Sequence, residues 1–253
     1  MNLYTNQFSE EHNFSFLGKP KKYLVIASTA RSGSHMLGHA LFDTKKFGFP
    51  LEYLNPANLH EWGRLLGTRN VLDTIGGLEK IRTSENGVFS IKIHYSQLVS
   101  VGGYQNFCNL FPLAKIIFLK RRNLVHQAVS YARALQTGVW ISGQRPVSTE
   151  ANYDYRLIDR CLRELIRDNA RWHYALESYG YRYLELYFED VKSDITKALV
   201  DIAHFLNVNL RHSEVGPYQR TSAQGDGLNH QWAIRYVEES KSSGFVDLLD
   251  QMG

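Results

Sequence analysis

The stretch YLVIAS at residues 23–28, followed by TARSGSH at residues 29–35, decides the fold. Its first six residues form a nearly continuous apolar run rich in β-formers, which is typical of a strand buried on both faces of a sheet. The polar residues after it are expected to form a tight turn, and residues 34–42 have helical character. The sequence therefore predicts a strand, a turn and a helix in direct succession.

The same alternation continues along the chain. Further strands are predicted at residues 88–93, 115–119 and 181–188, with helices at residues 124–136, 158–179 and 195–207 and a weaker helical signal from Ser96 onward. Because strands and helices alternate, we predict an α/β fold with a central parallel sheet flanked by helices. Ligands of such sheets bind at the carboxyl ends of the strands, so chemistry is expected just after Ser28, Ile93 and Leu119.

Two polar segments and the two ends of the chain complete the predicted organisation. Residues 144–151 and 215–229 are polar and contain Gly or Pro, so they are expected to be loops. The whole chain, residues 1–253, is expected to form a single domain, with residues 1–20 as a poorly defined N-terminal extension.

Composition favours a globular protein that binds an anion. The chain has 253 residues, 43% hydrophobic and 21% charged, with a formal charge of +4. This charge is too low, and the basic residues too dispersed, for a nucleic-acid binder. Two cysteines are too few for a disulfide framework, and no segment resembles a signal peptide or a membrane span, so a cytoplasmic protein is expected.

The turn after the first strand is a candidate anion site. Successive backbone N–H groups at a helix N-terminus attract a negative group, and Arg31 adds a fork of donors. The turn is not a Walker A loop, because Ser28 stands where the first glycine is required and Ser34 where the lysine is required. An ordinary turn with an exposed arginine remains an alternative explanation.

A second candidate anion site follows the strand at residues 115–119. Lys120, Arg121 and Arg122 come directly after it, and Ser130 lies on the next predicted helix. Two anion sites on one sheet predict a ligand with a phosphate group at both ends. The alternative is a solvated cationic cluster.

Taken together, these residues resemble the PAPS-dependent sulfotransferases, and most closely the bacterial carbohydrate branch typified by trehalose 2-sulfotransferase. The motifs that carry the resemblance are residues 23–28 with 31–34, 50–53, 127–130, 133–137 and 139–140, within a region of about residues 20–240. The resemblance implies a P-loop-like sulfotransferase fold, with PAPS as the donor, PAP as the product and no metal. It also implies site residues: Arg31, Ser32, Gly33, Ser34 and His35 for the 5′-phosphosulfate, and Arg121 with Ser130 for the 3′-phosphate. Arg122 is an alternative to Arg121, and Arg220 resembles a late segment that returns to the nucleotide.

Two residues compete as the general base that activates the acceptor hydroxyl. Glu52, in PLEY at residues 50–53, matches the element in which the bacterial carbohydrate enzymes are expected to place a base. His94, in Lys92-Ile93-His94, resembles the Lys-x-His of the cytosolic small-molecule enzymes. Either a carboxylate or a neutral imidazole can accept a proton near neutral pH. We favour Glu52, with His94 as a contact to the substrate or the sulfuryl group. Lys92 is placed to neutralise the leaving oxygen, and Arg31 supplies further positive charge.

Two alternative functions fit part of the sequence. A Mg-ATP-dependent P-loop kinase for small molecules is the leading alternative, and a non-catalytic nucleotide-binding module is a third. A metal site is not expected: His35 and His39 have the spacing of zinc peptidases, but Met36 replaces the glutamate. The expected partners are a small-molecule or glycolipid acceptor and, from the resemblance, a second copy of the chain in a homodimer.

Overall fold

The chain divides into two compact units in the computed structural model, which describes residues 5–141, 144–148, 150–216 and 227–242. The first unit comprises Met1–Arg122 and Arg167–Gln219, and the second comprises Asn123–Ile166 and Arg220–Gly253. The first unit contains the sheet, and each unit has its own hydrophobic core.

The central sheet of the first unit is parallel. It has four strands, β1 (Lys22–Ser28), β2 (Val88–His94), β3 (Lys115–Lys120) and β4 (Tyr183–Tyr187), in the order β2-β1-β3-β4. Ser28 pairs with His94 on one side and with Leu119 on the other. The carboxyl ends of the three strands with predicted site residues therefore meet at one edge of the sheet, and the predicted α/β class is confirmed.

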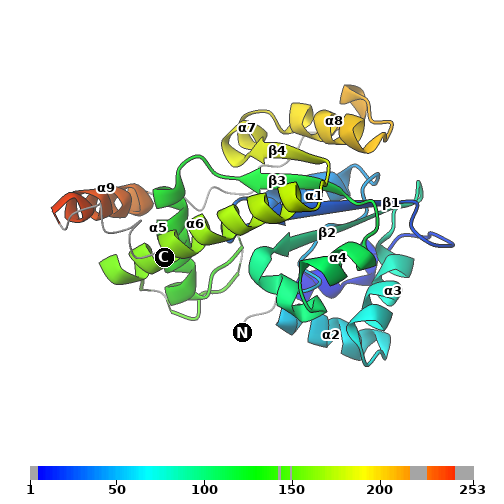
Figure 1. Cartoon of the computed structure of the whole chain (residues 1–253), viewed down its shortest axis with the longest axis horizontal. Helices are drawn as coiled ribbons and strands as arrows, with labels where there is room; N and C mark the ends of the chain where they lie inside the picture. The colour runs from blue at the N-terminus through cyan, green and yellow to red at the C-terminus, as the bar shows by residue number, and fades with distance from the viewer. Residues whose placement is uncertain (1–4, 142–143, 149, 217–226, 243–253) are drawn as a thin grey trace. The chain divides into compact units, whose positions relative to one another are not determined.

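Helices cover both faces of this sheet, as Figure 1 shows. Val25 and Ala27 of β1 face a core shared with α2 (Pro56–Leu66), α3 (Val71–Arg82), α4 (Tyr104–Leu110) and the C-terminal part of α6 (Tyr155–Ser178). Leu24 and Ile26 face the opposite core, which is built with α1 (Ser34–Asp43), α7 (Phe188–Ser193) and α8 (Ile195–Leu206). Alternate residues of one strand thus enter two cores, so β1 reads as a continuous apolar run.

Shorter elements and the second unit complete the architecture. The 3₁₀ helices are η1 (Thr5–Phe8), η2 (Glu10–His12), η3 (Tyr95–Val101) and η4 (His212–Glu214). The second unit packs α5 (Leu124–Thr137) and the beginning of α6 with α9 (Gly227–Ser242) around buried Ala132, Ile158 and Tyr236.

The structure differs from the sequence predictions at several boundaries. The last strand ends at Tyr187, because Phe188 begins the unpredicted helix α7. Residues 227–229 belong to α9 and not to a loop, whereas residues 217–226 lie outside the described residues. Helix α3 was not predicted, although the Asn70 side chain caps its N-terminus by accepting from the Asp73 N–H.

Gly33, at the start of α1, lies in a conformation and a space that only glycine fits. Its φ is +85°, and a Cβ built there would lie 2.0 Å from Cδ2 of Phe188. The neighbouring Arg31 also has a positive φ, of 61°. The turn between β1 and α1 is therefore strained in its backbone and closed by an aromatic ring from α7.

Helix α1 carries two histidines that stay neutral. The rings of His35 and His39 lie 4.3 Å apart between centroids. Burial, with smaller contributions from Lys92 and His39, lowers the pKa of His35 to about 2. Burial, with smaller contributions from Lys92 and His12, lowers the pKa of His39 to about 4. Neither ring therefore adds positive charge near neutral pH.

Replacing Gly33 by Ala should lower the free energy of unfolding by roughly 1–3 kcal/mol, because the new methyl group meets Phe188 and the backbone is left-handed. Chemical denaturation measures this change in the free energy of unfolding. Gly76→Ala is the matched control: Gly76 lies within α3 with no atom within 4 Å of an added Cβ, so this change should stabilise slightly. Equal effects of the two substitutions would contradict the role of Phe188.

Replacing His39 by Gln should reduce the pH dependence of stability between pH 6.5 and pH 4. The unfolded chain binds a proton at His39 below its ordinary pKa of 6.5, whereas the folded chain does so only near 4. Wild-type stability therefore falls as the pH drops through this window, by up to about 1.4 kcal/mol per pH unit for this proton. Denaturation at several pH values should show a shallower slope for His39→Gln, and identical slopes would contradict the prediction.

Candidate active site

The first candidate anion site lies between β1 and α1. The N–H of Ser32 donates to the Thr29 carbonyl oxygen at 3.3 Å and closes the turn. The N–H groups of the first turn of α1 follow it, and such groups together with the helix dipole favour an anion. The Ser32 hydroxyl is buried and has no hydrogen-bond partner among the described residues. The turn therefore presents donors at a point where a phosphate or sulfate oxygen would satisfy them.

Glu52 reaches the sheet through an isolated β-bridge. Leu51 pairs in parallel with Ile91 of β2, and the Lys92 N–H donates to the Leu51 carbonyl oxygen at 3.0 Å. On the other side, Asn58 of α2 donates from Nδ2 to the Glu52 carbonyl oxygen at 3.0 Å. The backbone of Glu52 is thus held between β2 and α2.

The side chains of Glu52, Lys92 and His94 form one cluster. Glu52 Oε1 lies 3.0 Å from Lys92 Nζ and 3.4 Å from His94 Nε2. Gln97 donates from Nε2 to Glu52 Oε2 at 2.7 Å. The Lys92 side chain is 5% exposed and that of Glu52 is 23% exposed, so the ion pair is buried on its cationic side and open on its anionic side. The structure brings together three of the residues predicted for the reacting centre.

The neighbours of Glu52 determine its charge. Burial alone would raise its pKa, but the charge of Lys92 and the contacts with Lys92 and His94 hold the pKa of this carboxyl well below its usual value. Glu52 is therefore a carboxylate at neutral pH, which is the form that can accept a proton. While Lys92 stays paired with it, the same attraction makes it a weak base.

Arg121 lies beside the first anion site. Its Nη1 donates to the carbonyl oxygen of Arg31 at 3.3 Å, and its guanidinium carbon lies 4.5 Å from the ring centroid of Phe188. Its Nε lies 3.9 Å from Oε1 of Glu189. The Phe188 ring therefore contacts both Arg121 and the turn at Gly33.

Arg122 has different partners. Its guanidinium forms two hydrogen bonds to Asp190, at 2.7 and 2.6 Å, and both side chains are more than half exposed. Its backbone N–H donates to Glu189 Oε2 at 3.2 Å. The two neighbouring arginines thus differ in direction: Arg121 contacts the turn at Arg31, whereas Arg122 pairs with Asp190.

The remaining predicted residues are placed as follows. Ser34 begins α1 and is buried, and neutral His35 lies one residue further along this helix. Ser130 lies on α5 in the second unit, whereas Arg121 belongs to the first, so a site shared by them stays a prediction. Arg220 lies outside the described residues. Within the described part of the chain, no group of three or more His, Cys, Asp or Glu side chains could hold a metal ion.

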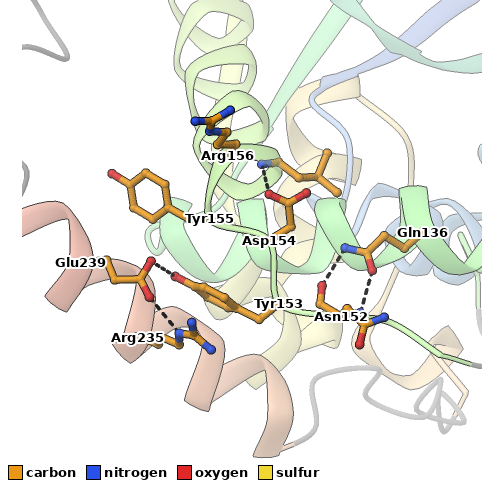
Figure 2. A pocket seen from close by; sticks show the side chains of 9 residues that line it. Gln136, Asn152, Tyr153, Asp154, Tyr155, Arg156, Arg235 and Glu239 are labelled. Atoms are coloured by element: carbon orange, nitrogen blue, oxygen red, sulfur yellow. Dashed lines mark hydrogen bonds and ion pairs between the residues drawn. The ribbon is translucent and has the colours of Figure 1, made fainter.

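A separate hollow lies within the second unit, as Figure 2 shows. It has a volume of about 540 Å³, and the residues that line it are Gln136, Asn152, Tyr153, Asp154, Tyr155, Arg156, Leu157, Arg235 and Glu239. Its polar groups pair with one another: Arg235 Nε donates to Glu239 at 2.8 Å, and the Tyr153 hydroxyl donates to the same carboxylate at 3.1 Å. None of the predicted site residues lines this hollow.

Sequence reasoning missed Gln97 and Phe188. Gln97 lies three residues after His94, and its Oε1 accepts from the His94 N–H at 3.1 Å while its Nε2 binds Glu52. The spacing of a helix cap after a strand could have identified it. Phe188 carried no comparable signal, since an aromatic residue after a strand is usually part of the core.

Comparison with known proteins identifies the family of this chain. A model of the Stf0 sulphotransferase family matches residues 92–239, which are more than half of the chain and begin at Lys92. The matched region therefore does not include the turn at Arg31 or Glu52. No curated protein matches the chain.

Two solved structures share the fold. A sulfotransferase from Alicyclobacillus acidocaldarius has a TM-score of 0.53 and 17% identity, covering 87% of this chain and 92% of that one. Mouse sulfotransferase SULT7A1 in complex with PAP has a TM-score of 0.50 and 18% identity, covering 94% of this chain and 86% of that one. With the family model matching more than half of its residues, the chain belongs to the Stf0 sulphotransferase family and is a PAPS-dependent sulfotransferase.

Proposed function

We propose that this enzyme transfers the sulfuryl group of PAPS to a hydroxyl group of a carbohydrate or glycolipid, with Glu52 as the general base. The observation that carries the proposal is the ion pair between Lys92 and Glu52, at 3.0 Å, at the strand edge that also holds the turn at Arg31. A carboxylate and an ammonium group in contact supply a proton acceptor and a positive charge to the same reaction.

The turn before α1 is proposed to hold the 5′ end of the donor. PAPS supplies an activated sulfuryl group on an anionic 5′-phosphate. The N–H groups at the start of α1 and the buried hydroxyl of Ser32, which has no partner among the described residues, fit the oxygens of such a group. Arg31 adds positive charge, and Gly33 lets the backbone approach closely. His35 contributes hydrogen bonding only, since its pKa is lowered to about 2.

Arg121 is proposed to bind the 3′-phosphate. Its contact with the Arg31 carbonyl oxygen, at 3.3 Å, supports a position beside the 5′ site, which a nucleotide with phosphates on both sides of its ribose requires. Arg122 is the alternative and would first have to leave Asp190. Ser130 and Arg220 remain predicted partners of the same nucleotide.

The proposed chemistry depends on what Lys92 contacts. In the structure, Lys92 holds the pKa of Glu52 low, so the carboxylate is ionised but weakly basic. Negative charge developing on the leaving oxygen attracts the Lys92 ammonium group more strongly as the reaction proceeds. As that attraction draws Lys92 away from Glu52, the carboxylate becomes more basic, and it accepts the proton of the attacking hydroxyl.

The proposed acceptor is a hydroxyl group of a carbohydrate or glycolipid. Its support is the resemblance of residues 50–53 and 127–140 to the bacterial carbohydrate branch.

No helix among the described residues is long and apolar enough to cross a bilayer. A cytoplasmic location and a homodimer stay predictions. Mass spectrometry of a panel of saccharides, glycolipids and phenols incubated with PAPS tests the acceptor class, and sulfation of phenols alone would contradict it.

Binding of PAP and 5′-AMP should separate the two phosphate sites. Arg121→Ala should weaken the binding of PAP by roughly tenfold to a hundredfold and leave the binding of 5′-AMP almost unchanged, because only PAP carries a 3′-phosphate. Arg31→Ala should weaken the binding of both nucleotides. Isothermal titration measures each affinity. Arg122→Ala is the matched neighbour and should have little effect. A loss selective for PAP in that variant would assign the 3′-phosphate to Arg122.

Replacing Glu52 by Gln should leave PAP affinity within about threefold of wild type and lower turnover by about 10²- to 10⁴-fold, because the amide cannot accept a proton. Sulfated product is quantified by mass spectrometry and PAP binding by calorimetry. His94→Gln is the comparison, and it should retain more activity than Glu52→Gln. Normal turnover by the Glu52→Gln enzyme would move the base to His94.

A further inference from the structure

Ser28, the last residue of β1, presents two different atoms to the same nitrogen of His94. His94 Nδ1 lies 3.2 Å from the Ser28 carbonyl oxygen and 3.3 Å from its hydroxyl oxygen. Ser28 is completely buried. The carbonyl can only accept a hydrogen bond, whereas the hydroxyl can also donate one. Ser28 can therefore pair with Nδ1 whether or not that nitrogen carries a proton.

Trp172 of α6 fixes the Ser28 carbonyl. Its indole Nε1 donates to that oxygen at 3.0 Å, and the whole residue is buried. The Tyr95 ring packs against the indole edge to face, with centroids 5.2 Å apart. A buried hydrogen bond between a rigid indole and a strand backbone leaves the carbonyl little freedom to move. Trp172 thus gives the Ser28 carbonyl oxygen a donor of its own, so this oxygen needs no proton from His94 Nδ1.

The other nitrogen of the ring faces a negative charge. His94 Nε2 lies 3.4 Å from Oε1 of Glu52, which is a carboxylate. An unprotonated Nε2 would place a lone pair against that oxygen, and a carboxylate only accepts hydrogen bonds. Nε2 therefore carries a proton in both the neutral and the charged imidazole. In the neutral ring, Nδ1 is then an acceptor and takes the Ser28 hydroxyl proton.

We propose that Ser28 and Trp172 are positioning residues that hold neutral His94 with its proton on Nε2, directed at Glu52. This inference rests on the proposed function and deepens it, because it assigns His94 as a hydrogen-bond donor to the base. The only nitrogen of His94 that can gain a proton faces a buried serine. His94 then orients the Glu52 carboxylate together with Gln97. Glu52 alone takes the proton from the hydroxyl group that attacks the sulfuryl group.

The side-chain nitrogens of His94 can be observed directly. Long-range ¹H–¹⁵N NMR spectra of the ¹⁵N-labelled full chain, assigned by comparison with His94→Gln, report which nitrogen is protonated. In its neutral form, wild-type His94 should carry its proton on Nε2. In Ser28→Ala the donor to Nδ1 is lost, so the proton should redistribute towards Nδ1, whereas Ser28→Thr should restore the wild-type pattern.

Kinetics provide a second readout with matched controls. Ser28→Ala should lower kcat by roughly tenfold, the effect of one buried hydrogen bond, with a smaller change in KM for PAPS, and Ser28→Thr should recover most of kcat. Trp172→Phe should also lower kcat. Ser90→Ala, which removes another buried hydroxyl that donates to the Phe47 carbonyl, should have little effect. Trp62→Phe should also have little effect, because the Trp62 indole N–H has no partner among the described residues.

Two outcomes overturn the inference. One is a neutral wild-type His94 with its proton on Nδ1. The other is an unchanged tautomer and kcat in Ser28→Ala. The tautomer is measured without any nucleotide, so these outcomes do not depend on the donor. If instead the wild-type chain failed to bind PAP or to form a sulfated product, the proposed function would fail while the tautomer result still stood.

Discussion

The contact between Lys92 and Glu52 is the interaction on which the candidate site depends. The two charges lie 3.0 Å apart because the β-bridge of Leu51 to Ile91 brings the Glu52 loop alongside β2, where Lys92 points to the same side. A buried ammonium group is costly unless it is paired, so removing the carboxylate would leave Lys92 uncompensated. The ion pair thus both places the proposed base and keeps a positive charge in the site.

A second constraint acts on the turn that precedes α1. Its backbone has positive φ at Arg31 and Gly33, and Phe188 closes the space against Gly33. The same Phe188 ring lies under the Arg121 guanidinium, and Arg121 in turn contacts the Arg31 carbonyl oxygen. One aromatic residue from α7 therefore links the two proposed phosphate contacts of the first unit, so the spacing between them does not depend on flexible side chains alone.

Much of the fold could be predicted from the sequence because burial on both faces of a parallel sheet leaves a strong signal. The apolar runs of β1 and β3 give the strands, and the rule that ligands bind at carboxyl ends placed Arg31, Lys92 and His94 at one edge. Glu52 could be predicted as a site residue only from the family resemblance, because a single β-bridge leaves no periodic pattern in the sequence. Phe188 and Trp172 could not be predicted, because their contacts join segments far apart in the chain.

The choice between the two arginines illustrates the same limit. Arg121 and Arg122 are chemically identical neighbours, so spacing along the sequence cannot distinguish them. Their partners differ because the side chain of Arg122 meets Asp190 while that of Arg121 meets Phe188 and the Arg31 carbonyl oxygen. These partners come from α7 and the turn before α1, so only the folded arrangement distinguishes the two arginines.

A crystal structure of the enzyme with PAP bound tests the central claim most directly. The 5′-phosphate should lie at the turn of residues 31–35, within hydrogen-bond distance of the Ser32 hydroxyl, with the Lys92 and Glu52 side chains adjacent to it. A nucleotide bound away from this turn, or a 5′-phosphate separated from Lys92 and Glu52 by the body of the sheet, would contradict it.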